Sequence, residues 1–465
     1  MPSRTPNVVY VFADQWPAHV AGFASHPDVR TPNLDRFASQ SVTCRRAIAN
    51  TPVCTPSRAS LLTGLFPHRH GLVLNDAPLD PALHTMGEHF AVAGYDTGYV
   101  GKWHVDGHGR TAYIPPERRH AFRHWKVLEC THDYNASVYY AGDDPTPRRW
   151  DGYDALAQAD DAAAFIRSAD GPFLLMLSWG PPHNPYDTAP ERFRELYDPA
   201  TLALRPNVPE AHAAATREVL AGFYAHCTAL DEAFGRVLSA IDEAGLADDT
   251  IVVFTADHGD HLGAHYLAEK QSPLDEALRI PLLVRWPGEL PVHTNDTVIG
   301  VVDHFQTICG LAGLPQPPAA QGRDLSAHLR AATKPGENLA LCASYHVFGT
   351  WPRQSEHKPV PDLFRAREYR GVRTERYTYC EDPDGPWLLF DNETDPYQLD
   401  NLVGREDHAA LQTELAAKLR ELLDRSGDEF LPGMEYVRRW GYEVDETGTI
   451  RIVDDSGGQP GPAAR

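Results

Sequence analysis

Four short apolar segments, each followed by polar residues, constrain the fold most. They span residues 7–13, 95–100, 172–179 and 250–256. These segments are rich in β-branched and aromatic residues and apolar on both faces, which is typical of buried parallel strands. Stretches with helical spacing, such as 213–244, lie between them. This alternation predicts an α/β fold with a large, mostly parallel sheet flanked by helices. Such sheets bind ligands at the carboxyl ends of their strands.

The segment Cys54-Thr-Pro-Ser-Arg-Ala-Ser-Leu-Leu-Thr-Gly64 predicts a helix that starts at Cys54. Proline is tolerated in a first helical turn, and Gly64 is a natural stop. Free N–H groups and the helix dipole at such a start favour negative charge and lower the pKa of a thiol. Arg58 lies one turn further on and can fold back toward Cys54. A buried cysteine at the start of an ordinary helix remains the alternative.

Polar side chains that could act in catalysis or bind a metal follow the predicted strands. They are Asp14, Gln15, Lys102, His104, His183, Asp257 and His258. Lys102 and His104 are two apart, so in an extended chain both would project to the same side. Taken singly, each of these residues has an ordinary role as a turn, cap or solvated side chain. Their shared place at strand ends predicts one site at one edge of the sheet.

The remaining chain divides into further predicted elements. Strands are expected at 42–48, 280–286, 371–379 and 386–390, and helices at 32–37, 85–93, 160–169, 303–312 and 407–425. Residues 105–170 are polar and poorly periodic, which favours loops at the surface or at a substrate site. Residues 336–370 are expected to be irregular. We therefore predict a catalytic domain at 1–337, a C-terminal subdomain at 338–456 and a disordered tail at 457–465.

The chain is strongly acidic, with a formal net charge of −22. This balance argues against nucleic acid or an anionic membrane as a partner. It also disfavours a densely sulfated polymer as substrate, unless basic residues gather locally. Seven cysteines without a Cys-x-x-Cys pair do not predict a disulfide framework. Without a signal-like or an 18-residue apolar segment, a cytoplasmic protein is expected.

Taken together, these motifs resemble the type I sulfatases of the alkaline phosphatase-like superfamily. The resemblance rests on Cys54-x-Pro-x-Arg58 with Leu-Thr-Gly, on Gly101-Lys-Trp-His104, on Pro182-His-x-Pro185 and on Asp257-His258, and it spans about 7–402. It implies a large parallel sheet with a smaller C-terminal antiparallel sheet-plus-helix subdomain. It also implies a sulfuric ester hydrolase that releases inorganic sulfate from an aryl or carbohydrate sulfate.

The family's chemistry implies a role for each matched residue. A formylglycine-generating enzyme would oxidise Cys54 to formylglycine, whose hydrate attacks the sulfate ester. One divalent cation would be held by Asp14, Gln15, Asp257, His258 and residue 54. Calcium is the family's usual ion, but Gln15 and His258 stand where many sulfatases have Asp and Asn, which leaves magnesium or manganese open. The implied catalytic residues are Cys54, Arg58, Lys102, His104, His183 and Lys270.

Several alternatives stay open at this point. The related phosphonate monoester or phosphodiester hydrolases share the formylglycine and a similar metal set. An N-sulfoglucosamine sulfohydrolase and an inactive binding homologue are further alternatives. The residues expected to face the small sulfated substrate are His132, Asp133, Arg323 and Asp324. The sequence does not predict an oligomeric state.

Overall fold

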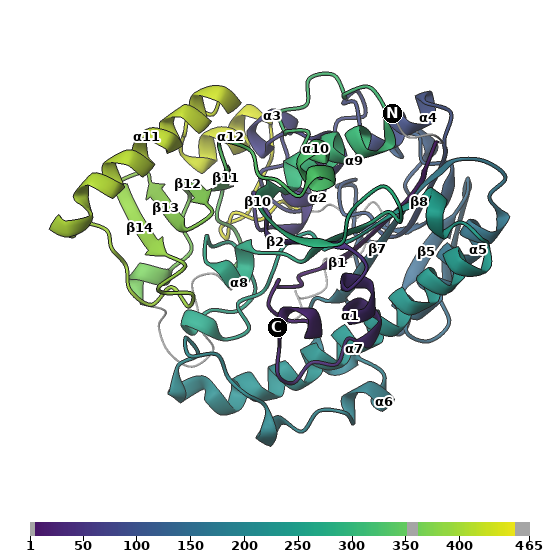
Figure 1. The fold of residues 1–465 in the computed structure, drawn as a ribbon, viewed down its shortest axis with the longest axis horizontal. Helices are drawn as coiled ribbons and strands as arrows, with labels where there is room; N and C mark the ends of the chain where they lie inside the picture. Colours follow the sequence, from purple (N-terminus) through teal and green to yellow (C-terminus); the bar gives the residue numbers. More distant parts are fainter. Residues whose placement is uncertain (1–4, 351–360, 452–465) are drawn as a thin grey trace.

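Two sheets organise the molecule in a computed structural model that describes residues 5–350 and 361–451 (Figure 1). The large sheet has ten strands, which lie side by side in the order β10 (His293–Gly300), β2 (Val42–Ile48), β9 (Leu282–Arg285), β8 (Thr250–Ala256), β1 (Asn7–Asp14), β7 (Phe173–Pro182), β3 (Asp96–Lys102), β4 (His124–Leu128), β5 (Val138–Ala141) and β6 (Asp144–Arg149). The pairs from β8 through β1, β7 and β3 to β4 are parallel. Because β9 and the β5–β6 hairpin run antiparallel, the sheet is mostly parallel, and the predicted α/β class is confirmed.

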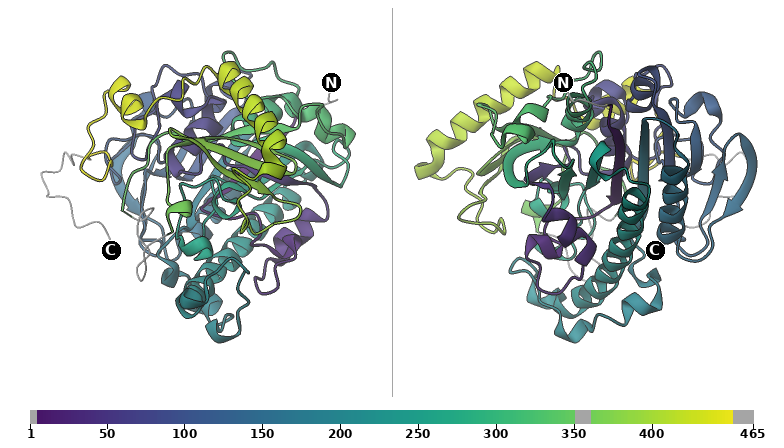
Figure 2. Two further views of the ribbon diagram at one scale, coloured as in Figure 1. Left: turned by 90° about the vertical axis from the view of Figure 1, so that its left-hand side faces the viewer. Right: turned by 45° about the vertical axis from the view of Figure 1, so that its right-hand side comes forward.

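Helices cover both faces of the large sheet (Figures 1 and 2). One layer contains α1 (Pro32–Ala38), α5 (Asp154–Ser168), α6 (Glu191–Arg194) and α7 (Ala213–Glu243). The other contains α2 (Cys54–Thr63), α3 (Pro67–His70), α4 (Met86–Val92), α9 (His304–Ala312) and α10 (Ser326–Ala331). The short helix α8 (Asp275–Leu278) follows the edge that carries the polar residues. In the described residues, no helix is long and apolar enough to cross a membrane.

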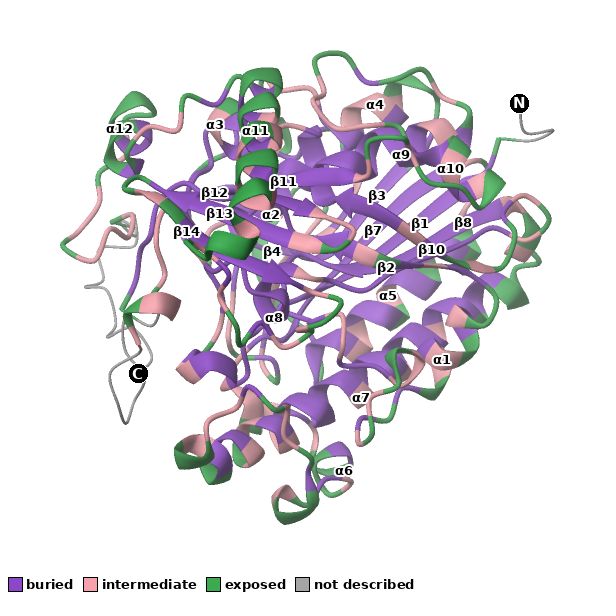
Figure 3. Cartoon of the chain, turned by 60° about the vertical axis from the view of Figure 1, so that its left-hand side comes forward, coloured by how far each residue is buried: buried purple, intermediate pink, exposed green. Residues whose placement is uncertain are grey.

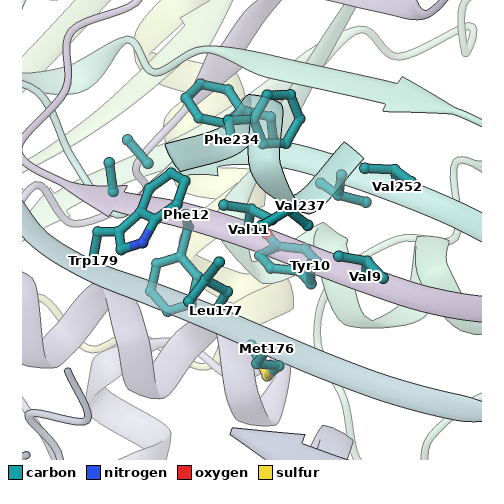
Figure 4. Close-up of a cluster of buried hydrophobic side chains, with 14 of the residues drawn as sticks. Val9, Tyr10, Val11, Phe12, Met176, Leu177, Trp179, Phe234, Val237 and Val252 are labelled. Atoms are coloured by element: carbon teal, nitrogen blue, oxygen red, sulfur yellow. The ribbon is translucent and has the colours of Figure 1, made fainter. Parts of the chain in front are cut away.

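The central strand β1 shows why this sheet is buried on both faces. Each of its residues is buried (Figure 3). Val11 lies toward Val237 of α7, while the Tyr10 hydroxyl hydrogen-bonds with His304 of α9, 2.6 Å away on the opposite face (Figure 4). Alternate side chains of a strand point to opposite faces, so an all-apolar strand requires a helical layer on each side. The continuous apolar run 7–13 predicted this arrangement.

A smaller antiparallel sheet forms the C-terminal part, with α11 (Ala409–Ser426) packed against it. Its strands lie in sequence order: β11 (Leu339–Ser344), β12 (Tyr369–Thr374), β13 (Tyr377–Asp382) and β14 (Gly385–Asp391). A last helix, α12 (Gly433–Arg439), follows. The sheet begins close to the predicted boundary at 337, but the division into domains stays a prediction. The predicted tail lies outside the described residues.

Several predictions about local structure were wrong. The stretch 105–170 contains the strands β4, β5 and β6, and α5 starts at Asp154 rather than 160. Strand β4 pairs with β3, so the secondary structure of this segment is set by pairing in the sheet, although its own sequence pattern is weak. Strand β6 carries two prolines, which are tolerated because β6 is the edge strand. Strand β10 was not predicted at all.

The C-terminal sheet also differs from its prediction. Strand β11 lies in a region expected to be irregular, although all six of its residues are buried. The stretch 371–379 is not one strand, because a turn at Glu375-Arg376 separates β12 from β13. The Thr374 hydroxyl accepts hydrogen bonds from the backbone N–H groups of Arg376 (3.3 Å) and Tyr377 (2.8 Å). A side chain thus closes a turn that lacks glycine, proline or asparagine.

Candidate active site

Helix α2 places Cys54 at the carboxyl edge of the large sheet. The helix begins at Cys54 and ends at Gly64, whose φ of 67° is the left-handed conformation that glycine adopts without strain. Every residue of α2 is buried. The backbone N–H of Thr55 donates to the side chain of Asn75 (3.0 Å), so one free N–H of the first turn is satisfied by a side chain. The predicted helix start at Cys54 is therefore confirmed.

Four buried side chains converge on one point at this edge. Asp14, Cys54, Asp257 and His258 each offer one ligand atom, and these atoms all lie within 4.8 Å of one another. The Cys54 Sγ lies 3.2 Å from His258 Nε2 and 3.6 Å from Asp14 Oδ1. Strands β1 and β8 are parallel neighbours, which brings their terminal acids together. Two carboxylates and an imidazole form a donor set that fits a divalent cation.

Buried cations surround the two carboxylates. Arg58 Nε lies 2.9 Å from Asp257 Oδ2, and its Nη2 lies 3.1 Å from Asp14 Oδ2. Lys102 Nζ lies 2.6 Å from the same Asp14 oxygen. Burial alone would raise the pKa of Asp14, but Lys102 and Arg58 hold it well below its usual range. The pKa of Asp257 is raised by burial and by the neighbouring charge of Asp14. The arrangement favours negative charge on an additional group bound at this point.

Lys270 connects the other side of the site. Its Nζ lies 2.7 Å from Gln15 Oε1, 2.8 Å from His183 Nε2 and 3.4 Å from Cys54 Sγ. Burial and the charge of Lys270 lower the pKa of His183 to about 4, so its imidazole is neutral near pH 7. Although burial opposes ionisation, the positive charges around Cys54, Lys270 foremost, bring the pKa of its thiol well below the usual value.

His104 reaches the site differently from the prediction. Strand β3 ends at Lys102, and His104 has a φ of 58°, so the two residues do not lie in one extended segment. His104 Nε2 lies 3.3 Å from Asp76 Oδ1, and Arg110 binds both oxygens of Asp76. Burial opposes the charged form, but negative charge at Cys130 and the bond to Asp76 raise the pKa of His104. The contact with Asp76 thus favours the charged form of His104.

Gln15 is oriented by two residues that were not predicted from the sequence, Asp260 and Tyr186. Its amide nitrogen Nε2 donates to Asp260 Oδ2 (2.7 Å) and to the Tyr186 hydroxyl (3.2 Å), which itself donates to Asp260. The amide is therefore fixed with Oε1 toward Lys270. Asp260 follows Asp257 by only three residues, so the Asp-His-Gly-Asp sequence held a signal for it. No sequence motif indicated a role in the site for Tyr186, Asp76, Arg110 or Cys130.

Gly259 shows how closely the chain must pack behind the ligand pair. A Cβ at this position would lie 2.0 Å from the backbone oxygen of Glu276, which belongs to α8. The Gly259 N–H also donates to the Ala277 carbonyl (2.8 Å). Only glycine fits here without moving His258 or α8.

Of the residues expected to face substrate, His132 lies at the site. Its ring stacks on that of His183, with centroids 4.9 Å apart and planes 16° from parallel. Asp133 is exposed nearby. The prediction for Arg323 and Asp324 needs correction. Arg323 binds both carboxylate oxygens of Asp303 at the start of α9, and Asp324 accepts from the backbone of Ser326 at the start of α10. Both side chains are thus occupied in holding helices.

The mostly parallel ten-stranded sheet, with its polar cluster at the carboxyl edge, defines the alkaline phosphatase-like class of hydrolases. Within that class, the chain belongs to the sulfatase family, whose profile matches residues 6–314. It is a sulfuric ester hydrolase. A second profile, the C-terminal part of N-sulphoglucosamine sulphohydrolase, matches residues 263–425.

Individual relatives agree with this assignment. An ulvan-active sulfatase from Formosa agariphila is 40% identical over 94% of this chain and 84% of its own length. An endo-4-O-sulfatase from Bacteroides thetaiotaomicron is 29% identical over 90% of this chain and 92% of its own. The phosphonate monoester hydrolase of Agrobacterium radiobacter covers 96% of this chain and 99% of its own, with a TM-score of 0.72 and 22% identity. The last likeness concerns the fold alone.

Proposed function

We propose that this sulfatase removes sulfate from a carbohydrate sulfate ester, with residue 54 as a formylglycine nucleophile beside one divalent cation. One observation carries the proposal: the two carboxylates, the imidazole and the Lys270 ammonium all converge on a buried cysteine at a helix start. The preference for a carbohydrate rests on the relatives, since one is named for ulvan and another as an endo-4-O-sulfatase.

The cation would be held by Asp14, Gln15, Asp257 and His258, together with residue 54. A cation bound there lowers the pKa of an attached hydroxyl and balances charge on the sulfate oxygens. The side chains of Asp14 and Asp257 supply hard oxygen donors, and Lys270 keeps the Gln15 oxygen directed into the site. We propose Ca²⁺ as the ion, and the imidazole of His258 keeps Mg²⁺ and Mn²⁺ as the alternatives.

The chain's own residues supply the remaining chemistry. Lys102 and Lys270 are placed to bind oxygens of the transferred sulfate, and Arg58 binds both carboxylates and so holds them in place. Because His183 is neutral and contacts the Lys270 ammonium, we assign His183 to passing a proton from Lys270 to the leaving alcohol. His104 is held by Asp76 and is the group we assign to proton transfer at residue 54 when sulfate is released.

Maturation requires a partner and a compartment. We propose that a formylglycine-generating enzyme acts on the segment 54–58 before it is buried, because Cys54 is 1% exposed in the folded chain. All seven cysteines are free and buried, which supports a reducing compartment such as the cytoplasm.

The test compares Cys54→Ala with Cys44→Ala, since both cysteines are free and buried but Cys44 lies in β2, away from the cluster. Both variants are expected to fold. We expect Cys54→Ala to lose essentially all hydrolysis of an aryl sulfate and of a sulfated oligosaccharide, while Cys44→Ala keeps it. Wild-type turnover by Cys54→Ala would overturn the proposal.

A further inference from the structure

A second concentration of positive charge lies away from the Cys54 cluster. A cavity of about 190 Å³ opens where β2, β10 and α8 meet the C-terminal sheet, and it is lined by Arg45, Arg46, Asp275, Arg279, Asp296 and Arg373, with Asn392 and Pro396. None of these residues belongs to the proposed catalytic or metal set. Four guanidinium groups therefore face one cavity with two carboxylates, in a chain whose net charge is −22.

The two carboxylates are each shared between arginines. Asp296 binds Arg45 through two hydrogen bonds of 2.8 and 3.1 Å and lies 3.4 Å from Arg46. On the other side, Asp275 binds Arg373 and lies 3.6 Å from Arg279. The carboxylates thus neutralise half of the positive charge, and the cavity keeps an excess of two.

Donors remain without partners in the same place. The Nε atoms of Arg279 and Arg373 are buried and have no hydrogen-bond acceptor in the described residues, whereas Nε of Arg46 lies 3.4 Å from Asp296 Oδ1. Arg373 itself is only 2% exposed, so bulk water does not satisfy its free N–H. Buried polar groups are rarely left unpaired, because each one loses its hydration without compensation. Two unpaired donors of residues that line one cavity add to its preference for an acceptor.

The electrostatics point to an anion as that acceptor. Burial lowers the pKa of Arg279, and the positive charges of Arg373, Arg46 and Arg205 lower it further, while Asp275 opposes them. A bound anion would relieve this repulsion. Guanidinium groups offer planar, paired donors that match sulfate, phosphate and carboxylate oxygens.

A second cavity of about 160 Å³ extends this basic surface. It shares Asp275, Arg279 and Pro396 with the first cavity and adds Arg205, His19 and Tyr397. The two cavities are therefore adjacent, although Arg205 is paired with Glu276 at 3.0 Å, so the excess positive charge belongs to the first cavity. Such a local concentration is what a sulfated chain would need in order to bind an otherwise acidic protein.

We propose that the cavity lined by Arg46, Arg279 and Arg373 is a binding site for a sulfate-type oxyanion, separate from the site of hydrolysis. The ligand is either a sulfate group of the saccharide chain, remote from the bond being cleaved, or free inorganic sulfate. Binding at this site does not depend on the proposed reaction. It can therefore be measured in protein whose residue 54 is unconverted.

The experiment measures binding of radiolabelled inorganic sulfate by equilibrium dialysis at constant ionic strength. It compares the wild type with Arg46→Gln/Arg279→Gln, with Lys102→Ala at the hydrolytic site, and with Arg236→Gln as a surface control. Arg236 lies on α7 and pairs with Glu232 and Asp160, outside either cavity. Circular dichroism checks that each variant is folded. Arg279→Lys serves as a milder variant that keeps the charge but loses the paired donors.

We expect the wild type and Arg236→Gln to bind two sulfates, one at the arginine-lined cavity and one at the hydrolytic site. Lys102→Ala should keep the sulfate at the cavity, and the double variant should lose that sulfate. The affinity of this sulfate should fall about tenfold or more in the double variant, because charge-assisted hydrogen bonds are removed, and by a smaller factor in Arg279→Lys. Sulfate binding unchanged in the double variant, or a single sulfate in the wild type that Lys102→Ala abolishes, would overturn the proposal.

A kinetic comparison then separates the two sources of the ligand. If the double variant raises KM for a sulfated polysaccharide but not for a small aryl sulfate, the site binds sulfate groups of the substrate chain. If sulfate binding is lost while both KM values stay unchanged, the site binds the free ion. Both outcomes support the oxyanion site, and the dialysis result alone decides whether it exists.

Discussion

At the scale of single residues, the site is a balance of buried charges around Cys54. The carboxylates of Asp14 and Asp257 are tied to Arg58, and Lys102 and Lys270 stand on opposite sides of the cluster. In a water-excluded site, fixed cations stabilise developing negative charge more strongly than solvent can. In the proposed mechanism each cation therefore contributes through its position as well as its charge.

Lys102→Ala should lower kcat/KM for an aryl sulfate by about 10²–10³, which is typical when one donor to a transition state is removed. Arg236→Gln, at an exposed ion pair, should leave it unchanged. Wild-type protein should prefer the aryl sulfate to the matched phenylphosphonate. Steady-state kinetics with both substrates checks this, and a preference for the phosphonate with no effect of Lys102→Ala would favour the phosphonate hydrolase alternative.

His132 should matter through the ring that it stacks on His183. We expect His132→Ala to slow cleavage of a sugar sulfate, by up to about the 10²-fold that one proton donor contributes, because a poor leaving group needs protonation. A small activated aryl sulfate should be affected little. His132→Phe preserves a flat ring and should restore most of the loss. Equal losses on both substrates, without rescue by phenylalanine, would assign His132 to the fold instead.

The sequence predicted the residues of the site better than the residues that orient them. Asp14, His183 and Asp257 could be predicted because they follow apolar strands, whose ends meet at one edge in a parallel sheet. Asp76 and Tyr186 lie in connecting segments, and only long-range packing brings them to His104 and Asp260. No local pattern marks such a contact. The prediction that His104 projects to the same side as Lys102 failed for a related reason, because the left-handed backbone of His104 is set by its surroundings.

At the scale of elements, central strands were predicted and peripheral ones were not. Strand β1 is apolar from Val8 to Ala13, whereas β5 is only partly buried and β6, at the edge of the sheet, is polar and mostly exposed. Edge strands need no apolar face on both sides, so their patterns resemble loops. Strand β11 of the small sheet is an exception, because its six residues are buried and mostly apolar, yet no strand was predicted there.

A buried ion pair joins the elements of the C-terminal part. Arg370 of β12 binds Asp428, which follows α11, and the hydroxyl of Tyr436 in α12 donates to the same carboxylate (2.6 Å). Asp428→Asn should destabilise this part by about 3–5 kcal/mol, because a buried guanidinium loses its counter-charge. Glu429→Gln removes an exposed pair with Arg439 and should cost less than about 1 kcal/mol. Denaturant unfolding measures both, and equal effects would contradict the account.

The same pair sets a dependence of stability on pH. Burial alone would raise the pKa of Asp428, but Arg370 brings it below its usual value. Its contribution to stability is therefore full above the unfolded pKa of about 4 and is lost as pH falls through the lower folded value. Below pH 4 the stability difference between wild type and Asp428→Asn should narrow. A difference that stayed constant down to low pH would show that Asp428 acts by packing alone.

At the scale of the whole molecule, two clusters of positively charged residues lie at different places in the fold. The carboxyl edge of the large sheet carries the proposed hydrolytic site, while the junction with the small sheet carries the arginine-lined cavity. An acidic surface with two local concentrations of positive charge suits a protein that binds anions only at defined places.

Removal of the cation should affect both activity and global stability. A chelator should abolish hydrolysis, and it should lower the unfolding temperature because a ligand bound only to the folded state stabilises it, by about 2.7 kcal/mol at 100 times its Kd. Added Ca²⁺ should restore both properties in the wild type. In Asp257→Asn the chelator should change the unfolding temperature little. Full activity in protein stripped of metal would contradict the assignment of the four ligands.

The central claim is that residue 54 acts as formylglycine. Turnover per molecule should be measured against the fraction of formylglycine at position 54, determined by mass spectrometry, in preparations made with different amounts of the maturing enzyme. The account predicts a straight line through the origin, since unconverted Cys54 lacks the attacking hydroxyl. Turnover that is independent of the converted fraction, or full activity with unmodified Cys54, would contradict it.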